Sequence, residues 1–166
     1  MSGAPTPELH GHPVMSADIL HGFHLLEADA GTGKTWTLSG LVVRALVERA
    51  LSIDRILVVT FTNAATAELA ERIRERIGQL ARLLEDRAAG RESAVSDPFC
   101  VAYAAQLPDP ASALRALRVA LAQVDEAALR AIHAFCHRVI AEHSLSIGVR
   151  ADAPAAAVDG AWIRQG

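Results

Sequence analysis

The chain has 166 residues, about the size of one domain, and its formal net charge of −3 leaves no overall basic field, so any contact with nucleic acid must be local. Apolar residues make up 51% of the chain but aromatic residues only 4%, so alanine inflates the count and a core has to rest on Leu, Ile and Val. Two cysteines are too few for a disulfide framework, and neither a secretory leader nor a membrane-length apolar run is present, so a soluble cytoplasmic protein without membrane contact is predicted.

The first segment, residues 1–18, is rich in Pro, Gly and His and predicts an irregular lead-in. Four histidines lie in or just after it, without the thiol or carboxylate spacing of a metal site: His10, His12, His21 and His24. We therefore favour a solvated tail over a metal centre.

A phosphate-binding loop is predicted next, because a short apolar run at His24–Leu26 is followed by a glycine-containing stretch that opens a helical pattern. Gly31 and Gly33 allow backbone conformations in which successive N–H groups point at an anion, and the start of the following helix adds further donors. Lys34 would contact the β- and γ-phosphates of a nucleotide, and the Thr35 hydroxyl would ligate Mg²⁺. The predicted nucleotide site comprises Ala28, Asp29, Ala30, Gly31, Thr32, Gly33, Lys34 and Thr35, with Ala28 where the strict pattern has glycine. The alternative is a plain glycine turn that caps a helix.

Periodicity places three elements after the loop. A helix is expected over 35–49, with an apolar stripe of Leu38, Leu41, Val42, Ala45 and Leu46. A strand over 53–60 contains a continuous apolar run and should be buried on both faces. A long helix over 64–84 has the stripe Leu69, Ile73, Ile77, Leu80 and Leu84, and its charged outer face is predicted to include Glu68, Glu71, Arg72, Arg74, Glu75 and Arg76.

The second half of the chain is predicted with less regularity. Residues 86–110 read as a loop or linker, and a helix should begin with Asp109 as its N-cap and Pro110 at its first position, continuing to about Val124. Residues 127–143 are ambiguous by pattern, and residues 151–166 form an irregular tail. The order strand, loop, helix, strand, helix predicts an α/β fold in which helical crossovers join a parallel sheet.

Polar and aromatic residues follow the predicted strand over 53–60, namely Phe61, Thr62 and Asn63. In an open parallel sheet, this end of a strand faces the ligand crevice. An aromatic ring among small polar groups suits stacking on single-stranded DNA. The alternative is an ordinary strand exit in which Asn63 caps the next helix.

Three stretches, 27–35, 59–69 and 131–138, resemble motif I, motif Ia and the following DNA-contact motif of superfamily 1 helicases of the UvrD/Rep type, and within them the RecB family of exonuclease V subunits. The resemblance runs from about Leu20 to about Ser146. It implies a RecA-like P-loop fold that binds ATP and Mg²⁺, with Lys34 and Thr35 as catalytic residues. It also implies single-stranded DNA or DNA ends as substrate and RecC-like and RecD-like subunits as partners. The DNA contacts that it implies are Phe61, Thr62, Asn63, His133 and Phe135.

The resemblance further implies a short strand near 129–132 and a helix from about Phe135, whereas we expect Cys136 to pack in the core. Two positions depart from the family pattern. Ala131 stands where the third motif often has Thr, and His21 aligns with a glutamine that reads adenine, which puts nucleotide selectivity in doubt.

The acidic pair that holds Mg²⁺ and activates water has two weak candidates, Asp125–Glu126 and Glu85–Asp86, neither of which follows an apolar strand. In the resembled family this motif, the second motor domain and the nuclease domain come later in the chain. We therefore expect an amino-terminal fragment or a truncated gene product that is inactive alone. The predicted division is a lead-in over 1–18, a partial UvrD-like ATP-binding domain over 19–150 with a helical insertion at about 86–126, and a tail over 151–166.

These observations predict the ATP-binding amino-terminal part of a RecB-like ATP-dependent DNA helicase/exonuclease subunit that acts in double-strand-break repair and recombination. The alternative is a non-catalytic nucleotide-binding or interaction module. A small P-loop kinase is a weaker option, because neither a phosphoacceptor pocket nor an arginine-rich lid is evident.

Overall fold

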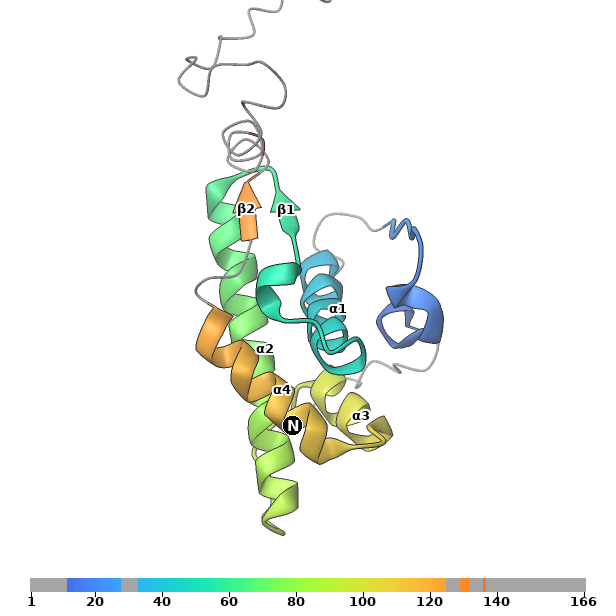
Figure 1. Cartoon of the computed structure of the whole chain (residues 1–166), viewed down its shortest axis with the longest axis vertical. Coiled ribbons are helices and arrows are strands. Elements are labelled where there is room, and N and C mark those ends of the chain that lie inside the picture. The colour runs from blue at the N-terminus through green and yellow to red at the C-terminus, as the bar shows by residue number, and fades with distance from the viewer. Residues whose placement is uncertain (1–11, 28–32, 125–128, 132–135, 137–166) are drawn as a thin grey trace, which may run out of the picture.

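The computed structural model describes residues 12–27, 33–124, 129–131 and 136. Short 3₁₀ turns η1 (Pro13–Met15) and η2 (Ala17–Leu20) precede helix α1 (Lys34–Glu48), the turn η3 (Ile53–Arg55) and strand β1 (Val58–Thr60). The long helix α2 (Asn63–Ala88), then α3 (Pro98–Gln106), α4 (Pro110–Gln123) and strand β2 (Leu129–Ala131) complete the described fold (Figure 1).

The two strands pair in parallel, with Val58 opposite Leu129 and Thr60 opposite Ala131. Parallel neighbours need a crossover connection, and here α2, α3 and α4 provide it. Within the described ranges these are the only strands, and residues 23–27 have no regular secondary structure, so the strand expected before the phosphate loop is not found there. Phe23 and Leu25 are exposed instead of paired in a sheet.

The strand predicted over 53–60 is correct only at its end. Ile53–Arg55 forms a 3₁₀ turn, and the strand spans Val58–Thr60. Burial on both faces is also wrong, because Leu57 is 47% and Val59 is 40% exposed. These two residues alternate with Ile56 and Val58, which pack against the core, so one face of this strand is covered in the described fold and the other is not.

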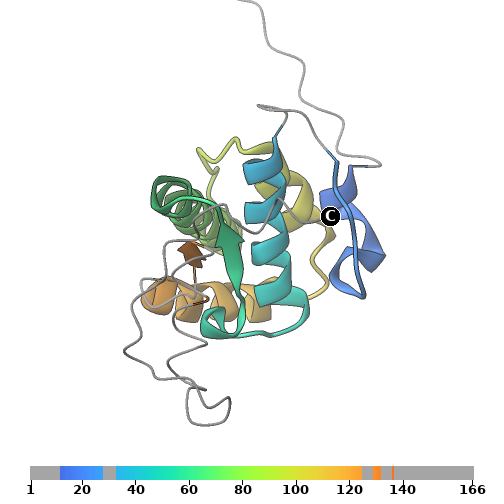
Figure 2. The same cartoon turned by 90° about the horizontal axis from the view of Figure 1, so that it is seen from above.

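Helix α2 is the longest described helix, and α1, α3 and α4 each pack against it (Figures 1 and 2). Its predicted apolar stripe is buried in full: Leu69, Ile73, Ile77, Leu80 and Leu84. The prediction for its outer face is wrong at one residue, because Arg76 is only 7% exposed. On α1 the stripe is shifted slightly, since Val42, Val43 and Leu46 are buried whereas Leu38 is exposed.

The loop predicted over 86–110 contains a helix. Helix α2 continues to Ala88, and α3 begins after Asp97, whose side chain accepts a hydrogen bond from the Cys100 N–H at 2.9 Å. Pro98 occupies the first turn of α3, where its missing N–H costs nothing. Phe99 and Tyr103 are buried and stack with ring centroids 5.2 Å apart, so this segment is part of the core.

Helix α4 begins as predicted, because the Asp109 side chain accepts a hydrogen bond from the Ser112 N–H and Pro110 lies in the first turn. The strand expected near 129–132 is confirmed by β2, whereas the core position expected for Cys136 is wrong, since this residue is helical and exposed. None of the described helices combines the length and the apolar character that a bilayer-spanning helix needs.

Residues 12–20 are more ordered than an irregular lead-in, because they pack on α1. Val14 is fully buried, and a Cβ on Gly40 would lie 2.6 Å from its Cγ2 atom, so α1 needs glycine at this point of close approach. The buried Arg44 side chain donates hydrogen bonds to the carbonyls of Val14 and Ser16, both at 2.7 Å. The lead-in is thereby attached to the helix that follows the phosphate loop.

Candidate nucleotide and DNA site

The start of α1 has the backbone conformation that the phosphate-loop prediction requires at Gly33. This residue is the N-cap of α1 with φ = 95°, a left-handed conformation that residues with a Cβ rarely adopt, and its carbonyl accepts a hydrogen bond from the Thr37 N–H at 2.8 Å. Lys34 and Thr35 follow as the first two helical residues, Lys34 exposed and Thr35 half-buried. Residues 28–32, the rest of the predicted loop, lie outside the described residues.

The two helices that follow the predicted nucleotide and DNA stretches begin at the same end of the sheet. Helices α1 and α2 run away from the end toward which β1 and β2 point (Figure 1), so each begins toward the carboxyl ends of the strands. In parallel α/β folds, ligands bind outside these carboxyl ends, where helix N-termini also present unpaired N–H groups. The arrangement can hold an anion at Lys34 and Thr35 and a second ligand at 61–63.

The turn between β1 and α2 displays Phe61, which is 87% exposed. Thr62 caps α2 by accepting a hydrogen bond from the Ala65 N–H at 3.1 Å, so the alternative in which Asn63 is the cap is wrong, and Asn63 is the exposed first residue of the helix. The Thr66 hydroxyl donates to the Thr62 carbonyl at 3.0 Å and lies 2.6 Å from the Thr60 hydroxyl. These threonines fix the turn that carries Phe61.

The other two predicted DNA contacts, His133 and Phe135, lie outside the described residues, as does the helix expected there except for Cys136. Ala131 is the last residue of β2, so the position at which the family often has Thr ends the second strand. The structure thus describes one of the two predicted DNA-contact stretches.

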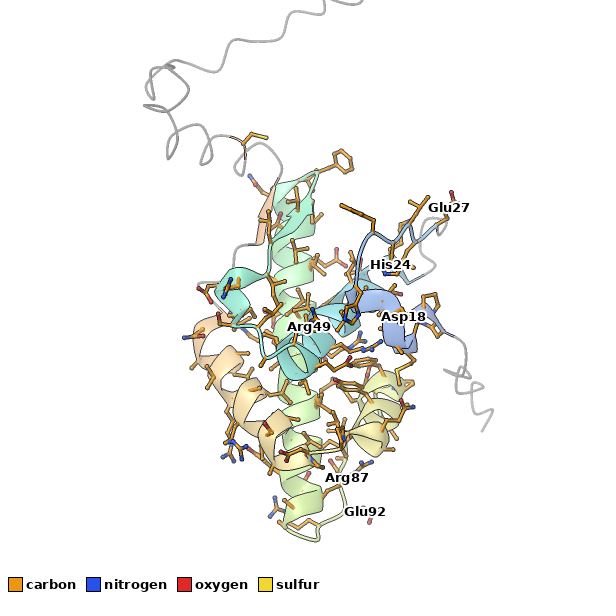
Figure 3. All side chains as sticks on the ribbon, turned by 45° about the vertical axis from the view of Figure 1, so that its right-hand side comes forward. Asp18, His24, Glu27, Arg49, Arg87 and Glu92 are labelled. Carbon is orange, nitrogen blue, oxygen red and sulfur yellow. The ribbon has the colours of Figure 1, made fainter. Side chains whose placement is uncertain are left out.

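His21, the residue expected at the adenine-reading position, lies in a small polar cluster beside α1 with Asp18, His24 and Arg49, three residues that Figure 3 labels. The Arg49 guanidinium lies 2.7 Å from His21 Nε2. Because a guanidinium only donates, this geometry makes His21 Nε2 the acceptor. His24 Nε2 lies 3.0 Å from the Asp18 carbonyl and 2.5 Å from the His21 carbonyl, which holds the turn closed.

The candidate acidic pair Glu85–Asp86 is engaged elsewhere. Glu85 pairs with Arg118 of α4 at 2.7 Å, and Asp86 pairs with Arg91 at 2.7 Å, whose hydrogen bond lowers the pKa of Asp86. Both lie near the C-terminal end of α2, the end at which Figure 3 labels Arg87 and Glu92, and therefore at the opposite end of that helix from Asn63. Asp125–Glu126 lies outside the described residues, and the described ranges hold no group of three His, Cys, Asp or Glu arranged to bind a metal ion.

Sequence reasoning missed Arg76, which lies behind the first turn of α1. The terminal nitrogen Nη1 of Arg76 donates to the Trp36 carbonyl and to the Ser39 hydroxyl, and the other terminal nitrogen, Nη2, donates to the Asp97 carboxylate at 3.1 Å. The guanidinium carbon lies 4.7 Å from the centre of the Trp36 ring. The sequence contained a signal, because Arg76 is three residues after Ile73 and four before Leu80 and so borders the apolar stripe.

Comparisons with known proteins agree with the motifs. The family described as UvrD/REP helicase N-terminal domain matches residues 13–160. The chain is 38% identical over 138 residues to the RecBCD enzyme subunit RecB of Escherichia coli (strain K12), 36% identical over 139 residues to that of Haemophilus influenzae, and 38% identical over 128 residues to that of Mycobacterium tuberculosis (strain CDC 1551). These matches cover 78%, 78% and 77% of this chain but only 11% of each relative. Since the family match takes in nearly the whole chain, the chain belongs to the UvrD/REP helicase N-terminal domain family and is similar to RecB subunits.

Proposed function

We propose that this chain is the ATP-binding amino-terminal part of a RecB-like, ATP-dependent DNA helicase/exonuclease subunit that acts in double-strand-break repair and recombination. The observation that carries the proposal is the helix start at Gly33–Thr35 within a family match over 13–160. The similarity to RecB subunits of the RecBCD enzyme supports the same assignment.

Residues 28–35 would hold the phosphates of ATP with Mg²⁺, and the chemistry supplied there is transfer of the terminal phosphoryl group to water. The left-handed Gly33 precedes the first turn of α1, whose free backbone N–H groups would face the phosphates. Lys34 is the only lysine in the chain, and it would place its ammonium on the β- and γ-phosphates, while the Thr35 hydroxyl would orient the metal ion. Adenine selectivity would depend on His21, which stacks or hydrogen-bonds in place of glutamine.

Single-stranded DNA or a DNA end would lie across the carboxyl ends of the strands. Phe61 would stack on a base, Thr62 and Asn63 would hydrogen-bond to the strand, and His133 and Phe135 would extend the same path. The domain that carries both sites would be a RecA-like parallel sheet with helical crossovers over 19–150, flanked by the lead-in 1–18 and the tail 151–166. Helices α3 and α4 would form its helical insertion over about 86–126, and RecC-like and RecD-like subunits would be the partners.

The test uses the single lysine. Because Lys34 and the α-amino group are the only primary amines, an amine-reactive reagent reports directly on Lys34 after peptide mapping. We expect Mg²⁺-ATP to protect Lys34 from labelling, and we expect Lys34→Ala to lose most of its affinity for a fluorescent ATP analogue. Arg55→Ala, which removes an exposed cation from η3, is the matched control and should bind as the unaltered chain does. Unchanged labelling with ATP, together with equal affinities of all three proteins, would contradict the proposal.

A further inference from the structure

Arg76 is a buried charged side chain of α2 that contacts residues of α1 and the start of α3. Its guanidinium packs against the rings of both Trp36 and Phe99, with its central carbon 4.7 Å and 5.4 Å from their centres. Removing a guanidinium from water is unfavourable unless its donors are satisfied and its charge is balanced. The Asp97 carboxylate lies 3.1 Å from the guanidinium and balances its charge, so the fold supplies a buried ion-pair partner for Arg76.

The hydrogen bonds of Arg76 converge on the first turn of α1. Trp36 is the third residue of that helix, and its carbonyl accepts from Arg76 Nη1 and also from the Ser39 hydroxyl at 2.9 Å. Ser39 Oγ in turn accepts from Arg76 Nη1 at 2.8 Å and is buried. Arg76 therefore holds the turn that begins with Lys34 and Thr35 from behind.

A space of about 190 Å³ lies beside Arg76, lined by Trp36, Ser39, Arg72, Glu75, Gln79 and Asp97. An anion site is a poor account of this space. Both terminal nitrogens of Arg76 already donate to protein acceptors, and the carboxylates of Glu75 and Asp97 line it as well. The bonds of Arg76 thus serve the fold around α1.

We propose that Arg76 is a positioning residue for the nucleotide site, acting through Trp36. It fixes the first turn of α1, and with it the Lys34 ammonium and the Thr35 hydroxyl, against α2. The preceding residue is a left-handed glycine, which by itself restrains this turn little. Among the described residues the other rings in contact with Trp36 are those of His12 and Phe99, with centroids 5.2 Å and 6.2 Å from its own, and neither ring bonds the backbone of the turn. This proposal rests on the proposed function, since it assigns Arg76 to the same phosphate site.

The test compares Arg76→Met and Arg76→Lys with the control Arg72→Met in the full chain. Arg72 lies one turn earlier on α2 and is exposed in an ion pair with Glu68 at 2.9 Å. Binding is measured for Mg²⁺-ATP, for inorganic tripolyphosphate and for a single-stranded oligothymidylate. Both Arg76 variants should lose about tenfold in affinity for ATP and tripolyphosphate alike, since preorganisation of the phosphate site is lost. Affinity for DNA, which contacts the start of α2, should stay within about twofold, and the control should change neither.

A purely structural role would give another pattern. Lower thermal stability with unchanged phosphate affinity would overturn the positioning role, and so would an equal loss of phosphate and DNA affinity. An unaltered chain that binds neither ATP nor tripolyphosphate would overturn the proposed function itself, and this proposal with it. If Arg76→Met does not fold, the test is the rate of amide hydrogen exchange over residues 34–39 in Arg76→Lys. Faster exchange than in the unaltered chain supports the proposal, and equal exchange refutes it.

Discussion

Phe61 exposes its ring at the end of β1, whereas Phe99 is fully buried in the core. An exposed phenyl ring contributes little hydrophobic stabilisation, so core packing does not account for the position of Phe61 in the described fold. The threonine hydroxyls of Thr60 and Thr66 and the Thr62 cap hold the turn on which it stands. An exposed ring on an ordered turn at the carboxyl end of a strand is suited to stacking on a nucleic acid base.

We expect Phe61→Ala to weaken binding of a single-stranded oligonucleotide by about 1–3 kcal/mol, the range found for loss of one base–aromatic stack. Fluorescence anisotropy at fixed salt measures the affinity. Phe23→Ala is the control, because it also removes a fully exposed phenyl ring, but from the segment before the phosphate loop. No loss in Phe61→Ala would remove this residue from the DNA path, and equal losses in both variants would indicate non-specific apolar contact.

The residues found from sequence are those whose role follows from local chemistry. Gly33 has the left-handed backbone that the loop motif requires, and the polar and aromatic residues 61–63 follow the carboxyl end of β1, so local sequence alone is enough to locate both stretches. Arg76 could not be placed, because its partners Trp36 and Asp97 lie 40 and 21 residues away and only the fold brings them together. The cap of α2 is Thr62 and not Asn63. Both residue types are good helix caps, so the sequence alone does not decide which of two neighbours occupies the cap position.

Helices α3 and α4 start with the same dipeptide, Asp-Pro, but the two caps have different surroundings. Asp109 is exposed and caps only its helix. Asp97 caps α3 with one carboxylate oxygen and pairs with the buried Arg76 with the other. The same substitution should therefore cost more at the second site, because it also leaves a buried guanidinium without its counter-charge.

We expect Asp109→Ala to lower the free energy of unfolding by about 1 kcal/mol, the usual loss of a helix cap. Asp97→Ala should lower it by about 3 kcal/mol, because the loss of a buried ion-pair partner is added. Urea denaturation monitored by circular dichroism measures both. Combining Asp97→Ala with Arg76→Met should recover part of the lost stability, because no buried guanidinium is then left without its partner. Equal losses of unfolding free energy in Asp97→Ala and Asp109→Ala would show that the ion pair of Asp97 with Arg76 contributes nothing to stability.

At the scale of elements, hydrophobic periodicity and start signals predicted α1, α2 and α4, since each has a long amphipathic repeat and a recognisable start. Helix α3 was missed because it has only nine residues and is apolar on most sides, with Val101 exposed beside Phe99 and Cys100, so no alternation marks it. The strand predicted over 53–60 was too long and was expected to be buried on both faces. A continuous apolar run shows neither how many of its residues pair with a neighbouring strand nor which elements cover its two faces. Within the described ranges β1 pairs with β2 alone.

At the scale of the molecule, three segments distant in sequence meet at one polar joint. Arg44 of α1 bonds the lead-in carbonyls and also Glu48, and Tyr103 of α3 donates its hydroxyl to the same carboxylate at 2.9 Å. Burial raises the pKa of Tyr103, so the phenol stays protonated and keeps donating. Burial also tends to raise the pKa of Glu48, but the hydrogen bonds from Arg44 and Tyr103 and the charge of Arg44 outweigh it and lower that pKa below its ordinary value.

This joint should make the stability of the whole chain fall in acid. A carboxyl whose pKa is lower in the folded chain stabilises it above the ordinary value of 4.5, and the contribution is lost as the pH falls through the lowered folded pKa. We expect Glu48→Gln to lower the free energy of unfolding by about 1 kcal/mol at pH 7, a modest value because the carboxylate is partly exposed, and the difference should vanish well below pH 4.5. Urea denaturation from pH 7 to pH 3 measures the difference, with Glu71→Gln as the control, since Glu71 is exposed and lies 3.9 Å from Arg74. A Glu48→Gln difference that is constant over this range would mean that the carboxylate charge plays no part in holding the lead-in, α1 and α3 together.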